Sequence, residues 1–160
     1  MDELYQTAIH EAGHAVMAVI LGRKIQYVTI EADDSRLGFC LYADNVPMNE
    51  SDFERGCRIQ AEAMSLIAGT TAEAVLLGVS PMDSRGKEDY EEVEKILAAP
   101  NDGKTKERDD YIHARAYSII GNHLVKQGIK AIADALIKRK TLLGEEIQQI
   151  MKSIEEKHKN

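Results

Sequence analysis

Near the N-terminus, apolar residues recur at three- and four-residue spacings, a pattern typical of an amphipathic helix. We expect this helix to run from about Leu4 to Leu21 and to end at Gly22. The positions that define it are Ala8, Ala12, Ala15, Val16, Val19 and Ile20. Since so much of its surface is apolar, the helix is predicted to be substantially buried.

The pattern then changes from helical periodicity to short runs of β-branched and aromatic residues. One run covers Ile25 to Ile30 and a second covers Leu37 to Tyr42, with the polar residues 32–35 between them. Two such runs joined by a short polar turn predict an antiparallel β-hairpin.

Helical patterns return after Pro47. Ser51 and Glu54 have the spacing of a capping box and predict a helix from there toward Ile67, followed by a separate apolar stretch, residues 72–77, that closes at Gly78. Later helices are expected over 87–98, around Ile112 to Ile120 with an end near Gly128, over 129–139, and over 144–156. The pattern thus predicts one domain, residues 1–160, of the α+β class, predominantly α-helical with a small antiparallel β-sheet.

Charge and composition narrow the classes of function. The formal net charge is −7, from 20 basic and 27 acidic residues, which argues against a nucleic-acid-binding surface. The longest strongly apolar run, Ala15 to Leu21, is far shorter than the ~20 residues of a membrane-spanning helix, so no membrane insertion is expected. Cys40 and Cys57 do not form a secreted disulfide pattern, and the start of the chain has no signal-peptide character, so we expect a cytoplasmic protein whose cysteines pack as small hydrophobes.

The most informative motif is His10-Glu11-Ala12-Gly13-His14. Residues four apart lie one turn apart on a helix, so the imidazoles of His10 and His14 can point at one ion, and Zn²⁺ is the ion that such a pair favours. The alternative is an accidental pair on a helix surface, but the apolar residues that follow place the motif on a buried helix. Glu11 would act as general base toward a zinc-bound water, as in a metallopeptidase.

The motif by itself leaves the third zinc ligand open. The segment from Asp83 to Tyr90 is the richest source of carboxylates. Within it, Asp89 would lie in the first turn of a helix, where the helix dipole also favours a carboxylate without any metal. His113 is expected to be a packed or surface histidine and not a ligand.

At these residues the chain resembles the peptidase domain of the FtsH-type ATP-dependent zinc metalloproteases. That family has a His-Glu-Ala-Gly-His-Ala helix, a strand pair with Val-Thr-Ile and Leu-Gly, a Gly-Arg-Ala-Ala-Glu-Glu helix, a Gly-Ala-x-Asn-Asp step and a closing Thr-Leu-x-Gly-Glu-Glu-Ile element. The matching segments here are residues 10–15, 28–30, 37–38, 68–74, 86–89 and 136–147. The resemblance covers almost the whole chain.

The resemblance implies the roles of several residues. The zinc ligands would be His10, His14 and Asp89, and Glu73 would support the zinc ligands, although helix packing explains Glu73 equally well. The second strand would be an edge to which an extended substrate adds, through Leu37, Gly38, Phe39 and Cys40. An ordinary half-buried strand is the alternative for these four residues.

The chain also departs from the family pattern. Thr70 replaces the family's arginine, Glu88 replaces the asparagine before the aspartate, and the stretch 98–110 is shorter. The length leaves no room for an ATPase motor, so we expect a stand-alone domain that cuts unfolded or flexible polypeptide, alone, by self-association, or with a separate ATPase. The alternative hypothesis is a catalytically weak zinc-binding adaptor or regulator that keeps the peptidase fold. A peptidase that cleaves one preferred regulator would share the chemistry of the first hypothesis.

Overall fold

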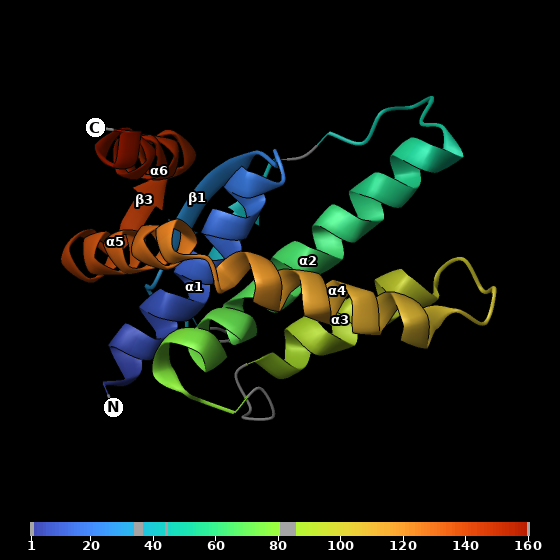
Figure 1. Ribbon diagram of the computed structural model, residues 1–160, viewed down its shortest axis with the longest axis horizontal. Coiled ribbons are helices and arrows are strands. Elements are labelled where there is room, and N and C mark those ends of the chain that lie inside the picture. The colour runs from blue at the N-terminus through green and yellow to red at the C-terminus, as the bar shows by residue number, and fades with distance from the viewer. Residues whose placement is uncertain (1, 34–36, 44, 81–85, 160) are drawn as a thin grey trace.

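The computed structural model describes residues 2–33, 37–43, 45–80 and 86–159. Within these ranges the chain forms six helices and three short strands (Figure 1). In chain order they are α1 (Glu3–Ile20), β1 (Ile25–Thr29), β2 (Phe39–Tyr42), α2 (Asp52–Leu77), α3 (Lys87–Ala98), α4 (Thr105–Ile120), α5 (His123–Arg139), β3 (Thr141–Leu143) and α6 (Gly144–Lys159). The prediction of a predominantly helical α+β fold is confirmed.

Helix α1 is the central element, and other elements pack around it. The Asp2 side chain caps its first turn by accepting a hydrogen bond from the Leu4 backbone N–H at 3.1 Å. Every residue from Thr7 to Ala18 is buried, including the three polar residues of the His-Glu-x-x-His motif. The helix packs mainly against α2 and α5 and also contacts the sheet, so the prediction that it is substantially buried is confirmed.

The backbones of α1 and α2 approach closely at Gly13. A Cβ atom at this position would lie 2.6 Å from the Ala68 carbonyl oxygen and 2.7 Å from the Ala72 Cβ. No side chain fits into that space without moving one helix, so the crossing of α1 and α2 depends on this glycine.

Helix α2 is one continuous helix, and the prediction of two separate segments was wrong. Its capping box is as expected, and Gly78 ends it in the left-handed conformation with φ of 68°. The polar residues Thr70 and Thr71 do not break the helix because their hydroxyls donate to the Ile67 carbonyl, at 2.9 and 2.8 Å. Helix hydrogen bonding therefore satisfies the buried hydroxyl groups that seemed to separate two apolar stretches.

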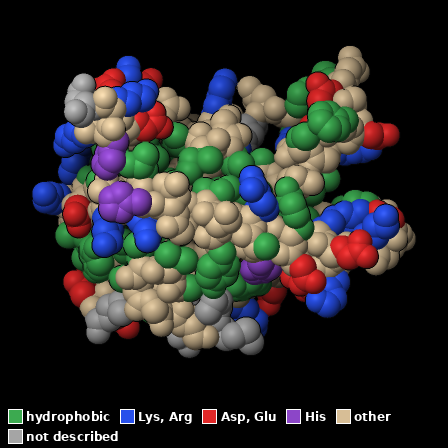
Figure 2. Space-filling model, viewed as in Figure 1, with side chains coloured by type: hydrophobic (Ala, Val, Ile, Leu, Met, Phe, Trp, Pro, Cys, Tyr) green, Lys and Arg blue, Asp and Glu red, His purple; other side chains and the backbone are tan. Residues whose placement is uncertain are grey.

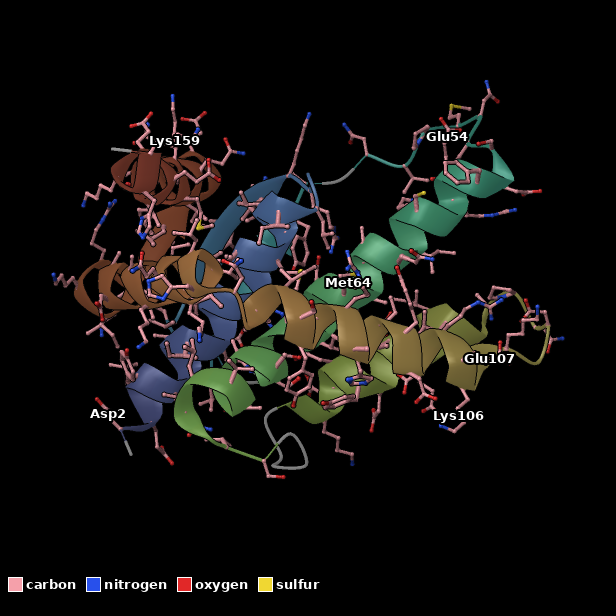
Figure 3. The ribbon with its side chains drawn as sticks, in the orientation of Figure 1. Asp2, Glu54, Met64, Lys106, Glu107 and Lys159 are labelled. Atoms are coloured by element: carbon pink, nitrogen blue, oxygen red, sulfur yellow. The ribbon has the colours of Figure 1, made fainter. Side chains whose placement is uncertain are left out.

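The N-terminal half of α2 projects from the body of the protein (Figure 2). Glu54 lies near the tip of this projection, whereas Met64, which is buried, lies where the helix joins the core (Figure 3). Cys57 is on the projecting half and is exposed, so the expectation that it packs as a small hydrophobe was wrong. Cys40 is half-buried against the core, as expected.

The three strands form an antiparallel sheet in the order β2-β1-β3. The predicted hairpin is confirmed, with Val28 opposite Cys40 and Thr29 opposite Phe39, and residues 34–36 of its turn lie outside the described residues. The third strand was not expected, because Thr141–Leu143 is short and pairs with β1, a segment more than a hundred residues away. This order leaves β2 at an edge of the described sheet.

The boundary between α4 and α5 also differs from the prediction. Helix α4 ends at Ile120, and Asn122 caps α5 by accepting from the Leu124 N–H at 2.9 Å. Gly128, expected to end a helix, lies inside α5, where a Cβ would be 2.5 Å from Met151 Sδ. This glycine therefore permits close packing of α5 on α6 and does not terminate a helix.

None of the described helices is both long enough and apolar enough to cross a membrane.

We predict that Gly13→Ala lowers the free energy of unfolding by about 1–3 kcal/mol, because the added methyl group overpacks the contact between α1 and α2. Urea denaturation with a chelator present measures this effect without any contribution from bound metal. Gly56→Ala is the matched control, since Gly56 lies in the exposed half of α2 and its Cβ would meet nothing within 4 Å. The control should gain roughly 0.5–1 kcal/mol from helix propensity. Equal effects of the two substitutions would contradict the close crossing.

Candidate metal centre

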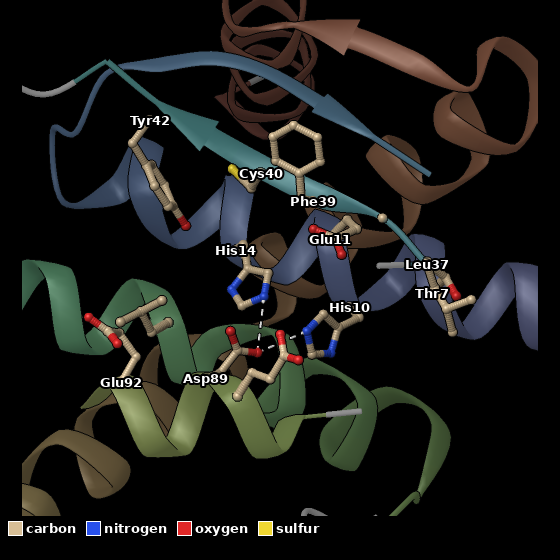
Figure 4. Close-up of a pocket in the computed structure, with 13 residues that line it drawn as sticks. Thr7, His10, Glu11, His14, Leu37, Phe39, Cys40, Tyr42, Asp89 and Glu92 are labelled. Atoms are coloured by element: carbon tan, nitrogen blue, oxygen red, sulfur yellow. Dashed lines mark hydrogen bonds and ion pairs between the residues drawn. The ribbon is translucent and has the colours of Figure 1, made fainter. Parts of the chain in front are cut away.

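Three potential metal ligands come together where α1 faces α3 (Figure 4). His10 and His14 lie one turn apart on α1, and one ligand atom from each and from Asp89 lie within 4.8 Å of one another. Asp89 Oδ2 is 3.1 Å from His10 Nε2 and 3.5 Å from His14 Nε2. The segment that the sequence favoured for the third ligand thus brings Asp89 to the histidine pair, whereas Asp83 lies outside the described residues.

Each histidine is held through its other ring nitrogen. His10 Nδ1 lies 2.5 Å from Glu73 Oε1, and His14 Nδ1 lies 2.7 Å from the Ser65 carbonyl oxygen. A carboxylate and a carbonyl can only accept, so both Nδ1 atoms donate and both Nε2 atoms are left to bind an ion. The Ser65 carbonyl had no signal in the sequence because any residue carries one.

Glycine is required at position 69 of α2. A Cβ there would lie 2.6 Å from both His10 Nε2 and His14 Nε2. The missing side chain therefore leaves room beside the two nitrogens that face Asp89. Two imidazole nitrogens and one carboxylate oxygen in a buried site are a donor set that fits Zn²⁺ with one position open.

Helix α3 is positioned by contacts at its start. A Cβ on Gly86 would lie 1.8 Å from Thr70 Cγ2, and Tyr90, one turn later, stacks on His113 of α4 with 5.5 Å between ring centroids. Both contacts hold the first turn of α3, which carries Asp89, against the rest of the protein. His113 is a packing residue here, outside the cluster of three ligands.

The cluster is strongly coupled electrostatically. Burial would lower the pKa of His10, but its hydrogen bonds with Asp89 and Glu73 raise the pKa to about 10. Burial would raise the pKa of Asp89, but the positive charge of His14 and the hydrogen bond with His10 hold it well below its usual range. A metal ion needs both imidazoles neutral, so protons and metal compete for the same nitrogen atoms.

Glu11 lies next to these ligands but does not join them. Its side chain is buried, and its Oε2 atom has no hydrogen-bond partner among the described residues. Burial raises the pKa of Glu11, which makes the carboxyl a better proton acceptor than an exposed glutamate. Gly38 permits this arrangement, since a Cβ on it would lie 3.1 Å from Glu11 Oε1 and 2.8 Å from the Thr29 carbonyl oxygen.

The cluster opens into a pocket of about 570 Å³. One wall is the edge strand β2 with the residues before it, so the four residues expected to touch substrate, Leu37, Gly38, Phe39 and Cys40, all line the pocket. The lining residues that sequence reasoning did not assign to the site are Thr7, Tyr42, Leu66, Glu88 and Glu92. The sequence carried a signal for Tyr42, because residues two apart on a strand share a face and Cys40 is one of the residues expected to touch substrate.

Comparison with known proteins found a distant similarity. No family model matches the chain. The chain is 24% identical over 191 residues to a protein described as ATP-dependent zinc metalloprotease FtsH from Mycoplasmopsis synoviae (strain 53). The match covers 94% of this chain and 28% of the relative, so the chain spans little more than a quarter of that protein's length. This match supports a distant relationship to the FtsH zinc metalloprotease family.

We predict that Asp89→Ala reduces zinc binding by at least about 100-fold, because it removes one of three ligands and leaves two imidazoles facing an empty position. Zinc content after dialysis against a competing chelator measures this loss. Glu92→Ala is the control, since Glu92 lines the same pocket but is outside the ligand cluster. If Glu92→Ala lost zinc and Asp89→Ala kept it, the ligand set would have to be reassigned.

We expect Glu73→Ala to weaken zinc binding by about 10–100-fold while leaving all three ligands in place. Without the carboxylate, His10 Nδ1 loses its acceptor at 2.5 Å, and the ring is no longer held in orientation. Competition titration with a chromogenic chelator gives the affinity. Unchanged affinity would show that Glu73 serves helix packing alone.

Proposed function

We propose that this chain is a zinc-dependent endopeptidase domain that hydrolyses peptide bonds in unfolded or flexible polypeptide. The observation that carries the proposal is the convergence in one pocket of His10, His14 and Asp89 with Glu11, whose Oε2 atom has no hydrogen-bond partner among the described residues. The distant similarity to a zinc metalloprotease supports it independently of that geometry.

In the proposed reaction, the ion and the Glu11 carboxylate have separate tasks. A bound zinc ion would supply Lewis-acid polarisation of the peptide carbonyl and lower the pKa of the attacking water toward ~7. Glu11 accepts a proton from that water as the water oxygen forms a bond to the carbonyl carbon. Glu11 then gives the proton to the leaving nitrogen as the C–N bond breaks, so the products are a carboxylate and an amine. The burial that raises the pKa of Glu11 favours the first of these transfers, from water to the carboxylate.

The edge strand supports an extended substrate as the form that is cleaved. Strand β2 pairs with β1 on one side, and within the described sheet its other side has no strand. A polypeptide that adds to this edge forms backbone hydrogen bonds whatever its sequence. Folded proteins seldom offer a free extended segment, so unfolded or flexible chains are the proposed substrate class.

The relative is described as ATP-dependent, and it is much longer than this chain. We propose that a separate ATPase, or self-association of this domain, supplies unfolded polypeptide to the pocket. Cys40 and Cys57 form no disulfide, which agrees with a reducing compartment, and we propose the cytoplasm.

A second candidate function is a zinc-binding adaptor or regulator with little hydrolytic activity. Two substitutions favour it: Thr70 and Glu88 stand where the resembled family has arginine and asparagine. Thr70 is buried and packs against Gly86, so the change affects how α3 docks beside the ligands. The two candidate functions predict the same zinc content but different rates of peptide hydrolysis.

We predict that Glu11→Gln retains zinc and loses about 10²–10⁴-fold in the rate of casein cleavage, because an amide cannot accept the proton. Casein is chosen because it is unstructured, and zinc content is measured on the same sample. Glu107→Gln, an exposed charge change on α4, is the control and should keep full activity.

Chelation should abolish cleavage by the unaltered protein, and added zinc should restore it. Retained cleavage in Glu11→Gln would rule out the proposed base. Zinc-loaded protein that shows no turnover would favour the adaptor.

A further inference from the structure

Two acidic residues beside the metal ligands have no part in the proposed chemistry. Glu88 and Glu92 lie one turn apart on α3, and Asp89 lies between them in the sequence. Both line the pocket, and both are exposed. Their carboxylates are therefore placed to contact a ligand that enters the pocket.

The charges around the pocket do not cancel. The two positive charges of a zinc ion would be balanced by Asp89 and Glu11, which leaves the charges of Glu88 and Glu92. No Lys or Arg is among the described residues that line the pocket. The Arg23 guanidinium lies behind this lining, 3.8 Å from the centre of the Tyr42 ring, and its single charge offsets at most one of the two carboxylates. Glu88 forms no ion pair with the described residues, and Glu92 has only Lys95, at 3.4 Å between two exposed side chains. Such a surface pair is weak and screened by salt, so the pocket keeps a negative potential.

A buried hydroxyl points to the same kind of ligand. Tyr42 lines the pocket from β2, and its Oη atom is buried without an oxygen or nitrogen hydrogen-bond partner among the described residues. The Cys40 thiol is a weak partner of this hydroxyl, and the Arg23 guanidinium lies over the ring, 3.8 Å from its centre. Tyr42 and Glu92 enter the pocket from opposite sides, and both lie toward His14 and away from His10 (Figure 4). A hydroxyl oxygen and carboxylates together are acceptors for an ammonium or guanidinium group.

We propose that this pocket selects polypeptides with Lys or Arg close to the scissile bond, with Glu88 and Glu92 as specificity-determining residues and the Tyr42 hydroxyl as a further acceptor. The inference rests on the proposed peptidase function and names its substrate class. Attraction of a basic side chain would raise kcat/KM for such substrates over neutral ones.

The test uses three fluorogenic peptides that are identical except for Lys, Gln or Glu at the positions flanking the cleaved bond. For the unaltered protein, kcat/KM should be about 3- to 10-fold higher with Lys than with Gln, and lower still with Glu. The double variant Glu88→Gln/Glu92→Gln should bring the Lys-to-Gln ratio close to one. Glu107→Gln/Glu145→Gln removes the same charge from exposed positions on α4 and α6 and should keep the ratio. High salt should reduce the ratio only where Glu88 and Glu92 are present.

The outcomes separate this inference from the function on which it rests. Cleavage of all three peptides at equal rates, or a Lys preference that survives in Glu88→Gln/Glu92→Gln, would overturn the inference and leave the peptidase proposal standing. Failure of the zinc-loaded protein to cleave any peptide would overturn both. Tyr42→Phe should lower the Lys-to-Gln ratio by a smaller factor than the double variant, and an unchanged ratio would remove Tyr42 from the subsite.

Discussion

The close crossing of α1 and α2 is the contact on which the site depends. Gly13 brings the two backbones together, and Gly69 leaves the space into which both His Nε2 atoms fit. Because the crossing is tight, Glu73 and the Ser65 carbonyl on α2 reach the Nδ1 atoms of the histidines on α1. A larger separation would leave two buried imidazoles without partners, which costs more free energy than a hydrogen bond contributes. The same crossing thus holds the core together and orients the two histidines of the candidate ligand set.

Polar groups inside this contact make the site costly to form and well defined once it has formed. Burial alone would lower the pKa of His10 and raise the pKa values of Glu11 and Asp89, and the contact between His10 and Asp89 reverses that effect for these two residues. Glu11 is the member that remains without a partner at one oxygen. A polar group left unsatisfied in a dense network is a common mark of a functional site, since a purely structural network would have paired it.

The pocket joins elements with different tasks. Helix α1 supplies the two histidines and the proposed base, α3 supplies Asp89 and the acidic wall, and β2 supplies an open edge. Of these, α1 is buried from Thr7 to Ala18, whereas β2 and the exposed face of α3 border the opening. On α3 the proposed ligand Asp89 and the proposed selecting residues Glu88 and Glu92 are different side chains of one helix, so the selecting residues could change without replacing a ligand.

The sequence determined the local features. Helical spacing placed His10 and His14 on one face of α1, and the Ser51 and Glu54 pair marked the start of α2. Two β-branched and aromatic runs joined by a polar turn identified the hairpin. Each of these signals depends on residues a few positions apart. Features that depend on distant segments had to come from the tertiary structure. Pairing of β3 with β1 and the role of Gly128 as a packing contact were missed for that reason. The continuity of α2 was misjudged for a local reason, since Thr70 and Thr71 satisfy their hydroxyls on the Ile67 carbonyl within the helix. Asp89 illustrates the division, since composition marked its segment and a family resemblance singled it out. Only the docking of α3 on α2, through Gly86 and Thr70, brings its carboxylate within reach of both histidines.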